Sequence, residues 1–126
     1  MVGYRNTEGY MDPVPYLALG RTGNQYRPLV YICFADSGDV EADTEKAKRY
    51  CRFAYEHGAI PIAPQLLFPQ FMDGRTEQDQ LTFMCIAILS HCKEIMVFGT
   101  PTAKMRNEIA FAERKWKTVT YYEEEV

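Results

Sequence analysis

The stretch that decides the fold is PLVYICFADSGDVEADTEKAKRYCRFAYEHGAIPIAP, residues 28–64. Its first part, residues 29–34, is a continuous run of β-branched, aromatic and other apolar side chains. Such a run is typical of a strand that is buried on both faces of a sheet. Small and polar residues end the strand at positions 35–39, and Asp39 can cap a following helix. The pattern predicts a central strand followed by a tight turn.

A helix and a second strand are predicted next. Four residues at i, i+3, i+4 and i+7 share one helical face: Ala47, Tyr50, Cys51 and Ala54. Acidic side chains come first in this segment and basic ones come later, which suits the dipole of a helix. Gly58 is expected to end the helix, and the apolar residues 59–63 are expected to form the second strand.

The remaining chain continues the alternation of strands and helices. A helix is expected from Thr76, with Leu81, Met84, Cys85, Ile88 and Cys92 on one face. Residues 94–98 form the third strand, and residues 118–122 form the last one. Between them, Met105, Ile109, Ala112 and Trp116 fall at i, i+4, i+7 and i+11 of a further helix. The acidic residues 123–125 are predicted to be a solvated tail.

Alternating strands and helices joined by right-handed crossovers give a parallel sheet with helices on both faces. We therefore expect a single-domain α/β fold, a Rossmann-like or flavodoxin-like three-layer sandwich. Its sheet would be mostly parallel, with four to five strands in an order of about 2-1-3-4. Residues 28–126 would form this domain, and the tyrosine-rich residues 1–27 would form an N-terminal arm. Within the arm, residues 16–19 suggest a helical turn.

The composition excludes several classes of protein. The chain has 126 residues and a net charge of −3, without the basic face that a nucleic-acid-binding protein needs. No apolar run is long enough to span a membrane, and no secretory segment is present, so we expect a cytoplasmic protein. The four cysteines lack a C-x-x-C pair and are expected to be free thiols in the core. Neither a metal nor a cofactor is expected.

The ligand site of such a sheet lies beyond the carboxyl ends of the strands, near the point where strand order reverses. Three segments would line this crevice here, namely residues 34–39, 64–71 and 99–108. The first segment leads into a helix start that is crowded with carboxylates, which disfavours a phosphate. Asp36 and Asp39 are better suited to accept hydrogen bonds from the hydroxyl groups of a sugar.

Residues 64–74 are apolar but interrupted by prolines, so they are neither a good helix nor a good strand interior. We expect this segment to form a loop that covers either a ligand site or the core. Its three large apolar residues, Leu66, Leu67 and Phe68, would form a wall for a flat ligand such as a base, or they would simply close the core.

Glu108 is the candidate for chemistry. It lies three residues after Met105 and four before Ala112, so its side chain projects close to the apolar face of its helix. Desolvation there raises the pKa of a carboxyl group, whereas the positive end of the helix lowers it. Such a carboxylate could act as a nucleophile or hold ribose hydroxyls. The alternative is a surface glutamate that pairs with Lys104 one turn earlier.

Residues 28–71, with the motifs VYI, SGDVEA, EKAKRYCRFA and IPIAPQLLFPQF, resemble a family of small uncharacterised bacterial and phage proteins. This DUF4406-like family is related to the nucleoside 2-deoxyribosyltransferases. The opening NTEGYMDPVPYLAL resembles the N-terminal segment of that family as well, so the resemblance covers nearly the whole chain.

The resemblance implies a reaction. In the transferases and the related deoxynucleoside-monophosphate N-glycosidases, a glutamate at the start of the helix after the third strand is the nucleophile. The motif of residues 105–109 places Glu108 at that position. It would attack the anomeric carbon, hold the deoxyribosyl group covalently and pass it to another base or to water, as in retaining glycosidases. The expected substrate contacts are Phe34, Asp36, Ser37, Gly38, Asp39, Gln65, Phe68, Gly99, Lys104 and Met105.

The chain departs from those enzymes at four positions. Asp36 stands in place of the tyrosine of a Ser-Pro-Tyr segment, Gln65 in place of a histidine, Cys85 in place of an aspartate and Lys104 in place of a glycine. Loss of an acid and a histidine weakens the protonation of a leaving group. Lys104 could instead meet a 5′-phosphate as a point charge.

The sequence and this resemblance lead to three hypotheses for the function. The first is an enzyme, a transferase or hydrolase that cleaves or transfers at the N-glycosidic bond of a deoxynucleoside or its 5′-monophosphate. The second is an inactive nucleotide-binding protein that senses or sequesters a nucleotide-derived signal, for example in phage anti-defence. The resemblance also implies a homo-oligomer, since relatives complete their sites across a subunit interface. An assembly protein that uses the tyrosine-rich arm is a third hypothesis.

Overall fold

The computed structural model describes residues 5–6, 10–11 and 26–126 of the chain. Two short strands, β1 (Arg5–Asn6) and β2 (Tyr10–Met11), pair in an antiparallel manner. The helical turn expected at residues 16–19 lies outside the described residues.

Four parallel strands form the main sheet. They are β3 (Leu29–Phe34), β4 (Ile60–Ile62), β5 (Glu94–Phe98) and β6 (Thr118–Tyr122). Their order is β4-β3-β5-β6, and every neighbouring pair is parallel. The expected order of about 2-1-3-4 is therefore confirmed, and so is the α/β fold class.

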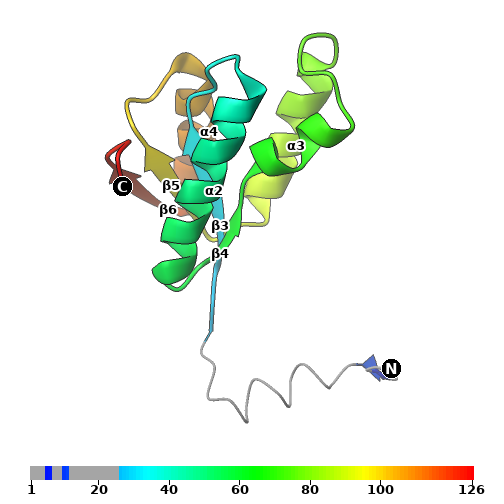
Figure 1. Cartoon of the computed structure of the whole chain (residues 1–126). Coiled ribbons are helices and arrows are strands. Elements are labelled where there is room, and N and C mark those ends of the chain that lie inside the picture. The colour runs from blue at the N-terminus through cyan, green and yellow to red at the C-terminus, as the bar shows by residue number, and fades with distance from the viewer. Residues whose placement is uncertain (1–4, 7–9, 12–25) are drawn as a thin grey trace.

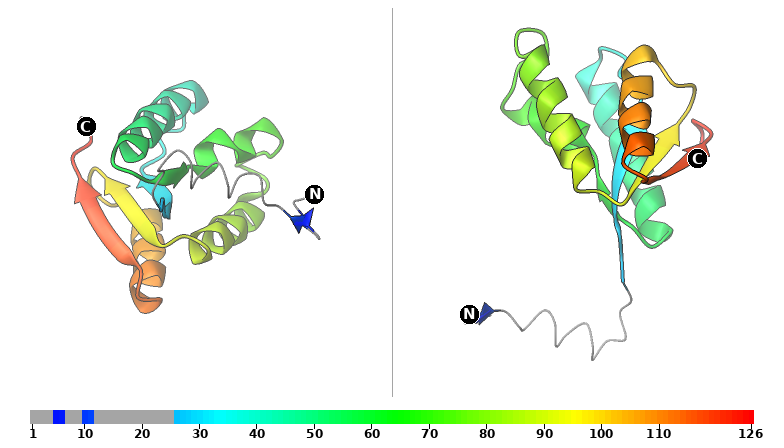
Figure 2. Two further views of the ribbon diagram at one scale, coloured as in Figure 1. Left: turned by 90° about the horizontal axis from the view of Figure 1, so that it is seen from below. Right: turned by 180° about the vertical axis from the view of Figure 1, so that it is seen from behind.

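Three helices cover the two faces of this sheet. The helix α2 (Val40–Glu56) lies on one face, whereas α3 (Gln78–Ser90) and α4 (Ala103–Arg114) lie on the other (Figures 1 and 2). Side chains of β3 alternate between the two layers because the period of a strand is two. Val30, Ile32 and Phe34 pack toward α2, while Tyr31 and Cys33 pack toward α3 and α4.

Local sequence explains where the helices begin. Asp39 is the N-cap of α2, and its Oδ1 accepts hydrogen bonds from the amides of Glu41 and Ala42 at 3.1 and 3.3 Å. Thr102 caps α4, with its Oγ1 accepting from the amide of Met105 at 3.3 Å. Both caps satisfy amides that have no partner within the helix. They fix the two helix starts that face the carboxyl ends of β3 and β5.

The segment after β4 is more regular than the sequence predicts. It forms two single 3-10 turns, η1 (Pro64–Leu66) and η2 (Phe68–Gln70), each with a proline at its start. Proline suits these positions because its fixed φ is helical and its missing amide is not needed. The two turns lead over residues 71–77 to α3, which begins at Gln78, two residues later than expected.

The predicted extent of the α4 face is wrong at its end. The helix stops at Arg114, so Trp116 does not continue the apolar face of Met105, Ile109 and Ala112. Trp116 instead adopts a positive φ of 61° and is 94% exposed. A helix usually ends with glycine at this left-handed position. The sequence has no glycine at the end of this helix, so the predicted apolar face extended one turn beyond the actual end.

The acidic tail is exposed but not free. The Lys46 ammonium pairs with Glu124 at 2.7 Å, and the Arg49 guanidinium donates to the carbonyl oxygens of Glu124 and Val126 at 3.0 and 3.2 Å. Tyr50 donates its hydroxyl to the Glu124 carbonyl at 2.9 Å. The expectation of a solvated tail is therefore confirmed, although contacts with α2 hold part of the tail in place.

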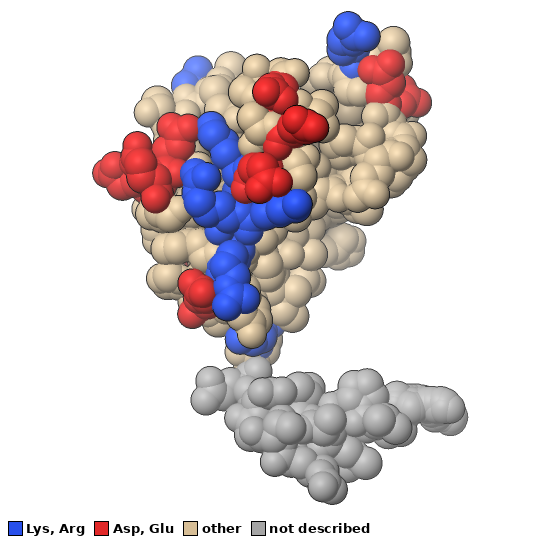
Figure 3. All heavy atoms as spheres, in the orientation of Figure 1, with Lys and Arg blue, Asp and Glu red and all other residues tan. Residues whose placement is uncertain are grey.

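A stripe of lysine and arginine runs along α2 in the space-filling view (Figure 3). Acidic side chains neutralise much of it, through the pairs Lys46–Glu124, Lys48–Glu45 and Arg52–Glu56. A compensated stripe is a poor surface for a phosphate backbone. Among the helices of residues 26–126, none is long and apolar enough to cross a membrane.

The cysteines pack as expected. Cys33, Cys85 and Cys92 are buried, Cys51 is half-buried, and all four are free thiols. In the residues that the structure describes, no three His, Cys, Asp or Glu side chains gather in a way that could hold a metal ion.

Candidate functional site

A pocket of about 890 Å³ lies beyond the carboxyl end of β3, between the starts of α2, α3 and α4 and the two 3-10 turns. This is the crevice that the strand order predicts, because β3 is the strand at which the order reverses. Eight of the residues expected at the site line this pocket: Phe34, Asp36, Gly38, Gln65, Phe68, Lys104, Met105 and Glu108. The volume is within the range of small-molecule sites in proteins.

Glu108 lies at the floor of the pocket and is only 8% exposed. Its Oε2 accepts a hydrogen bond from the Tyr31 hydroxyl at 2.8 Å, and its Oε1 accepts one from the Cys33 thiol at 3.4 Å. Both donors come from β3, and they share a face because they are two residues apart. The carboxylate is therefore fixed by two neutral donors rather than by a cation, and the surface-glutamate alternative does not describe Glu108.

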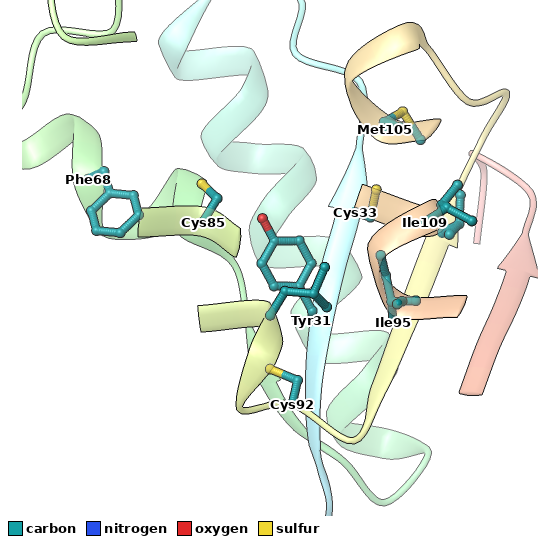
Figure 4. Packing of buried hydrophobic residues seen from close by; sticks show 11 residues of the cluster. Tyr31, Cys33, Phe68, Cys85, Cys92, Ile95, Met105 and Ile109 are labelled. Atoms are coloured by element: carbon teal, nitrogen blue, oxygen red, sulfur yellow. The ribbon is translucent and has the colours of Figure 1, made fainter. Parts of the chain in front are cut away.

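The close-up view shows how this floor is built (Figure 4). Tyr31 and Cys33 project from β3, with Met105 and Ile109 of α4 on one side and Phe68 and Cys85 on the other. These six residues belong to one buried cluster. Apolar side chains therefore surround the carboxylate and exclude water from most of its surface.

Burial shapes the ionisation of this group. Desolvation raises the pKa of Glu108, while the hydrogen bonds from Tyr31 and Cys33 and the charge of Lys104 oppose the shift. Burial and the charge of Glu108 raise the pKa of Tyr31 and of Cys33 well above their usual ranges. Tyr31 and Cys33 therefore keep their protons at neutral pH and remain hydrogen-bond donors.

The rim of the pocket holds a polar cluster of Asp36, Gln65 and Lys104. The Lys104 ammonium lies 3.3 Å from Oδ2 of Asp36, and the Gln65 amide donates to Oδ1 of Asp36 at 3.2 Å. The structure thus brings together three side chains that lie far apart in the sequence.

Gln65 also leaves one acceptor open. Its Oε1 is buried and has no hydrogen-bond partner in the described part of the chain. A buried oxygen without a donor is costly. A ligand that offers an N–H or O–H group to this oxygen would remove that cost.

Two expected contacts have other roles. Asp39 caps α2, and Ser37 donates its hydroxyl to Oδ1 of Asp43 at 2.7 Å. The Ser37 amide donates to the same carboxylate at 3.0 and 3.1 Å. Neither Asp39 nor Ser37 lines the pocket. Their side chains already bond to backbone amides and to Asp43, and their contact with a substrate stays a prediction.

Gly99 is also away from the pocket. It has a φ of 83°, its amide donates to the Tyr122 carbonyl at 3.0 Å, and a Cβ at this position would face Glu124. Gly99 therefore lies beside the end of β6 and the C-terminal tail. Gly99 does not line the pocket, and its expected role in substrate binding stays a prediction.

Sequence reasoning missed three residues that build the site. Asp43 lies four residues before Ala47 and seven before Tyr50, on the buried face of α2, and this period could have identified it. The signal for Tyr31 and Cys33 is their alternation in β3, which places both on the face opposite Ile32. A hydroxyl in the middle of a buried strand needs a partner, and Glu108 is that partner.

No curated protein matches this chain. A protein-family model does match it, over residues 28–122 of the 126, and its description is "Domain of unknown function (DUF7768)". The match begins at the residue before β3 and ends with β6, so it contains the whole main sheet and every side chain that lines the pocket. The chain belongs to the DUF7768 family.

Proposed function

We propose that this chain binds a deoxynucleoside or a deoxynucleoside 5′-monophosphate in the pocket and breaks its N-glycosidic bond through Glu108. The supporting observation is the Glu108 carboxylate itself, which is buried at the pocket floor with a donor on each oxygen. A desolvated, oriented carboxylate is the nucleophile of retaining glycosidases. The resemblance to nucleoside 2-deoxyribosyltransferases supports the choice of a deoxyribosyl substrate.

The proposed reaction has two steps. A carboxylate oxygen of Glu108 attacks the anomeric carbon of the sugar, the C–N bond breaks, and its electron pair leaves with the base, which takes up a proton from solvent. Water or a second base then attacks the same carbon, and the ester bond to Glu108 breaks. Tyr31 and Cys33 keep their hydrogen bonds throughout and hold the carboxylate in the attacking orientation.

The rim would select the substrate. Lys104 can meet a 5′-phosphate as a point charge, in competition with its present partner Asp36. The open oxygen of Gln65 can accept a hydrogen bond from the substrate. Phe68 is an apolar wall residue beside them. Of the three loop residues considered for a wall, Leu66 packs in the core on the α2 side and Leu67 is exposed.

One observation favours a second candidate. Asp36 is engaged by Lys104 and Gln65, so this rim carboxylate is poorly placed to protonate a departing base. A protein with this rim would bind a nucleotide without turnover, and would sense or sequester a nucleotide-derived signal, for example in phage anti-defence. In both proposals the ligand is a small molecule rather than a nucleic acid, and we propose that the protein acts in the cytoplasm as a homo-oligomer.

A single assay separates the two candidates. The protein is incubated with deoxynucleosides and their 5′-monophosphates, free base is measured by chromatography, and ligand-induced shifts in melting temperature are measured in parallel. We expect base release by the wild type and by Glu113→Gln, a control at an exposed glutamate of α4, but not by Glu108→Gln. A melting shift without base release would support the binding protein, and neither response would refute both proposals for these ligands.

A further inference from the structure

The outer edge of β6 is an unpaired strand edge. Among the described strands, β6 has β5 as its one neighbour, and it is the outermost strand of the main sheet (Figure 2, left). The amide of Thr118 donates to Lys93 at 3.3 Å, and the carbonyl of Tyr122 accepts from Gly99 at 3.0 Å, both on the β5 side. Since backbone groups alternate along a parallel strand, the amides and carbonyls of Val119 and Tyr121 point away from the sheet.

This edge lacks the features that usually protect a strand from pairing. Natural edges are short or carry proline, lysine or a bulge. The opposite edge strand, β4, has three residues and contains Pro61. In contrast, β6 has five residues, TVTYY, without proline or charge. Its Tyr121 side chain is 58% exposed.

Trp116 gives a second, independent observation. It stands directly before β6, it is 94% exposed, and it adopts a positive φ where glycine would be unstrained. Its backbone ends α4, but its large aromatic side chain is left in water. Exposed tryptophans are prominent among the residues that carry binding energy at protein interfaces.

The charges beside β6 identify the partner. Lys115 and Lys117 precede the strand, and Glu123, Glu124 and Glu125 follow it. An antiparallel pair of two β6 strands centred on Thr120 would bring the basic start of each strand to the acidic end of the other. In this register Val119 of each copy lies opposite Tyr121 of the other, and their outward backbone groups can bond. The edge is thus complementary to itself.

Existing contacts show which charges remain available. Lys117 already donates to the carbonyls of Ser90 and Cys92, and Glu124 pairs with Lys46. Lys115 has no ion-pair partner among residues 26–126, and the same holds for Glu125. In a symmetric dimer, Lys115 of each copy would face Glu125 of the other copy, so this contact would occur twice.

We propose that β6 pairs in an antiparallel manner with β6 of a second copy of this chain, so that two four-stranded sheets join into one. The two-fold axis passes beside Thr120, and Trp116 of each copy covers the C-terminal turn of the other. A contact of this kind is isologous and closes at a dimer. It does not involve the pocket, so it holds whether or not the pocket is catalytic.

The mass of the full chain in solution tests the contact. We expect light scattering to give twice the chain mass of 14.6 kDa. Tyr121→Pro removes an outward amide that β5 does not use, and it should give a monomer with an unchanged circular dichroism spectrum. Tyr121→Ala keeps this amide and should remain a dimer at high concentration. A monomeric wild type, or a folded Tyr121→Pro variant that stays dimeric, would overturn the proposal.

Two charge reversals outside β6 test which residues of the two paired strands lie opposite each other. Lys115→Glu and Glu125→Lys should each weaken the dimer, by about tenfold in dissociation constant, because each places like charges together twice. An equimolar mixture should recover wild-type affinity, since both contacts are then attractive. Singles that dimerise like the wild type, or a mixture without recovery, would exclude this register.

Trp116 is the one tryptophan of the chain and reports on the contact directly. Its fluorescence should shift to shorter wavelength and become less accessible to acrylamide as protein concentration rises through the dimer range. Emission that stays constant while the mass doubles would mean that the dimer uses another surface, and would contradict the proposal.

Discussion

At the floor of the pocket, Glu108 is buried and receives hydrogen bonds from two neutral side chains, whereas at the rim Asp36 is exposed and pairs with the Lys104 cation. The two carboxylates of this pocket are therefore held by different interactions, namely neutral hydrogen bonds at Glu108 and an ion pair at Asp36. Removal of a donor from a buried group leaves an uncompensated desolvation cost, while an exposed pair is screened by water and salt. Changes at the floor should consequently have large effects on the chemistry, and changes at the rim should alter substrate preference.

The largest effect should come from Glu108→Asp. The shorter side chain withdraws the carboxylate from Tyr31 and Cys33 and from the anomeric carbon. A misplacement of about 1 Å costs on the order of a hundredfold in rate. We expect base release to fall by at least this factor, with ligand-induced melting shifts preserved. Retention of more than about a tenth of the wild-type rate would show that the position of this carboxylate does not limit the reaction.

The next effect should come from Tyr31→Phe, which removes the shorter of the two hydrogen bonds to Glu108. The pKa of Glu108 should rise further because this bond lowers it. The acidic limb of the pH–rate profile should therefore move to higher pH, and the rate at neutral pH should fall by roughly tenfold.

Tyr50→Phe is the matched control. Tyr50 is equally buried, but its hydroxyl bonds to the Glu124 carbonyl on the opposite face of the sheet. This variant should lose stability by about 1 kcal/mol without any movement of the pH profile. If both variants moved the profile alike, the shift would reflect general loosening of the core rather than the contact with Glu108.

Stability should depend on pH through Glu108. Burial raises the folded-state pKa of its carboxyl group above the ordinary value of 4.5, so the folded protein binds more protons than the unfolded chain between these two values. The free energy of unfolding therefore falls as pH rises through this window. Glu108→Gln removes this ionisable group. The free energy of unfolding of the variant, relative to that of the wild type, should therefore increase from about pH 4.5 upward. If urea denaturation gave the two proteins the same dependence of unfolding free energy on pH, this result would contradict the desolvation of Glu108.

The smallest effect on stability should come from the rim. Lys104→Met breaks the exposed pair with Asp36 and should change the free energy of unfolding by less than about 1 kcal/mol. The same variant should lose the preference for monophosphates over nucleosides, by about tenfold in kcat/KM, because a charge-assisted contact is lost. Arg106→Met on the same helix is the control, since this side chain bonds to the Pro101 carbonyl. An unchanged preference would place the phosphate elsewhere.

Much of the fold could be predicted because its signals are local and periodic. The apolar run of residues 29–34 and the strand at residues 94–98 have the predicted bounds, and the sheet has the expected strand order. The end of α4 was missed because the usual glycine is absent and Trp116 takes its place. The turns at residues 64–70 were missed because prolines within a loop also start 3-10 helices.

The site was harder to predict because it depends on contacts between distant segments. Spacing placed Glu108 near the apolar face of its helix, but its partners lie 77 and 75 residues away in β3. The Asp36–Lys104 pair spans 68 residues. Asp39 and Ser37 had the right chemistry for a sugar, but local backbone amides and Asp43 compete for the same atoms. Such competition within a turn is visible once the helix start is known.

The most direct test of the central claim is the intact mass of the protein after a brief reaction with a deoxynucleoside 5′-monophosphate and an acid quench. We predict an adduct of one deoxyribosyl group that still carries its 5′-phosphate, located on the peptide that contains Glu108, in the wild type and in Glu113→Gln but not in Glu108→Gln. Release of free base by the wild type without any adduct on this peptide, or an adduct that persists in Glu108→Gln, would contradict the assignment of Glu108 as the nucleophile.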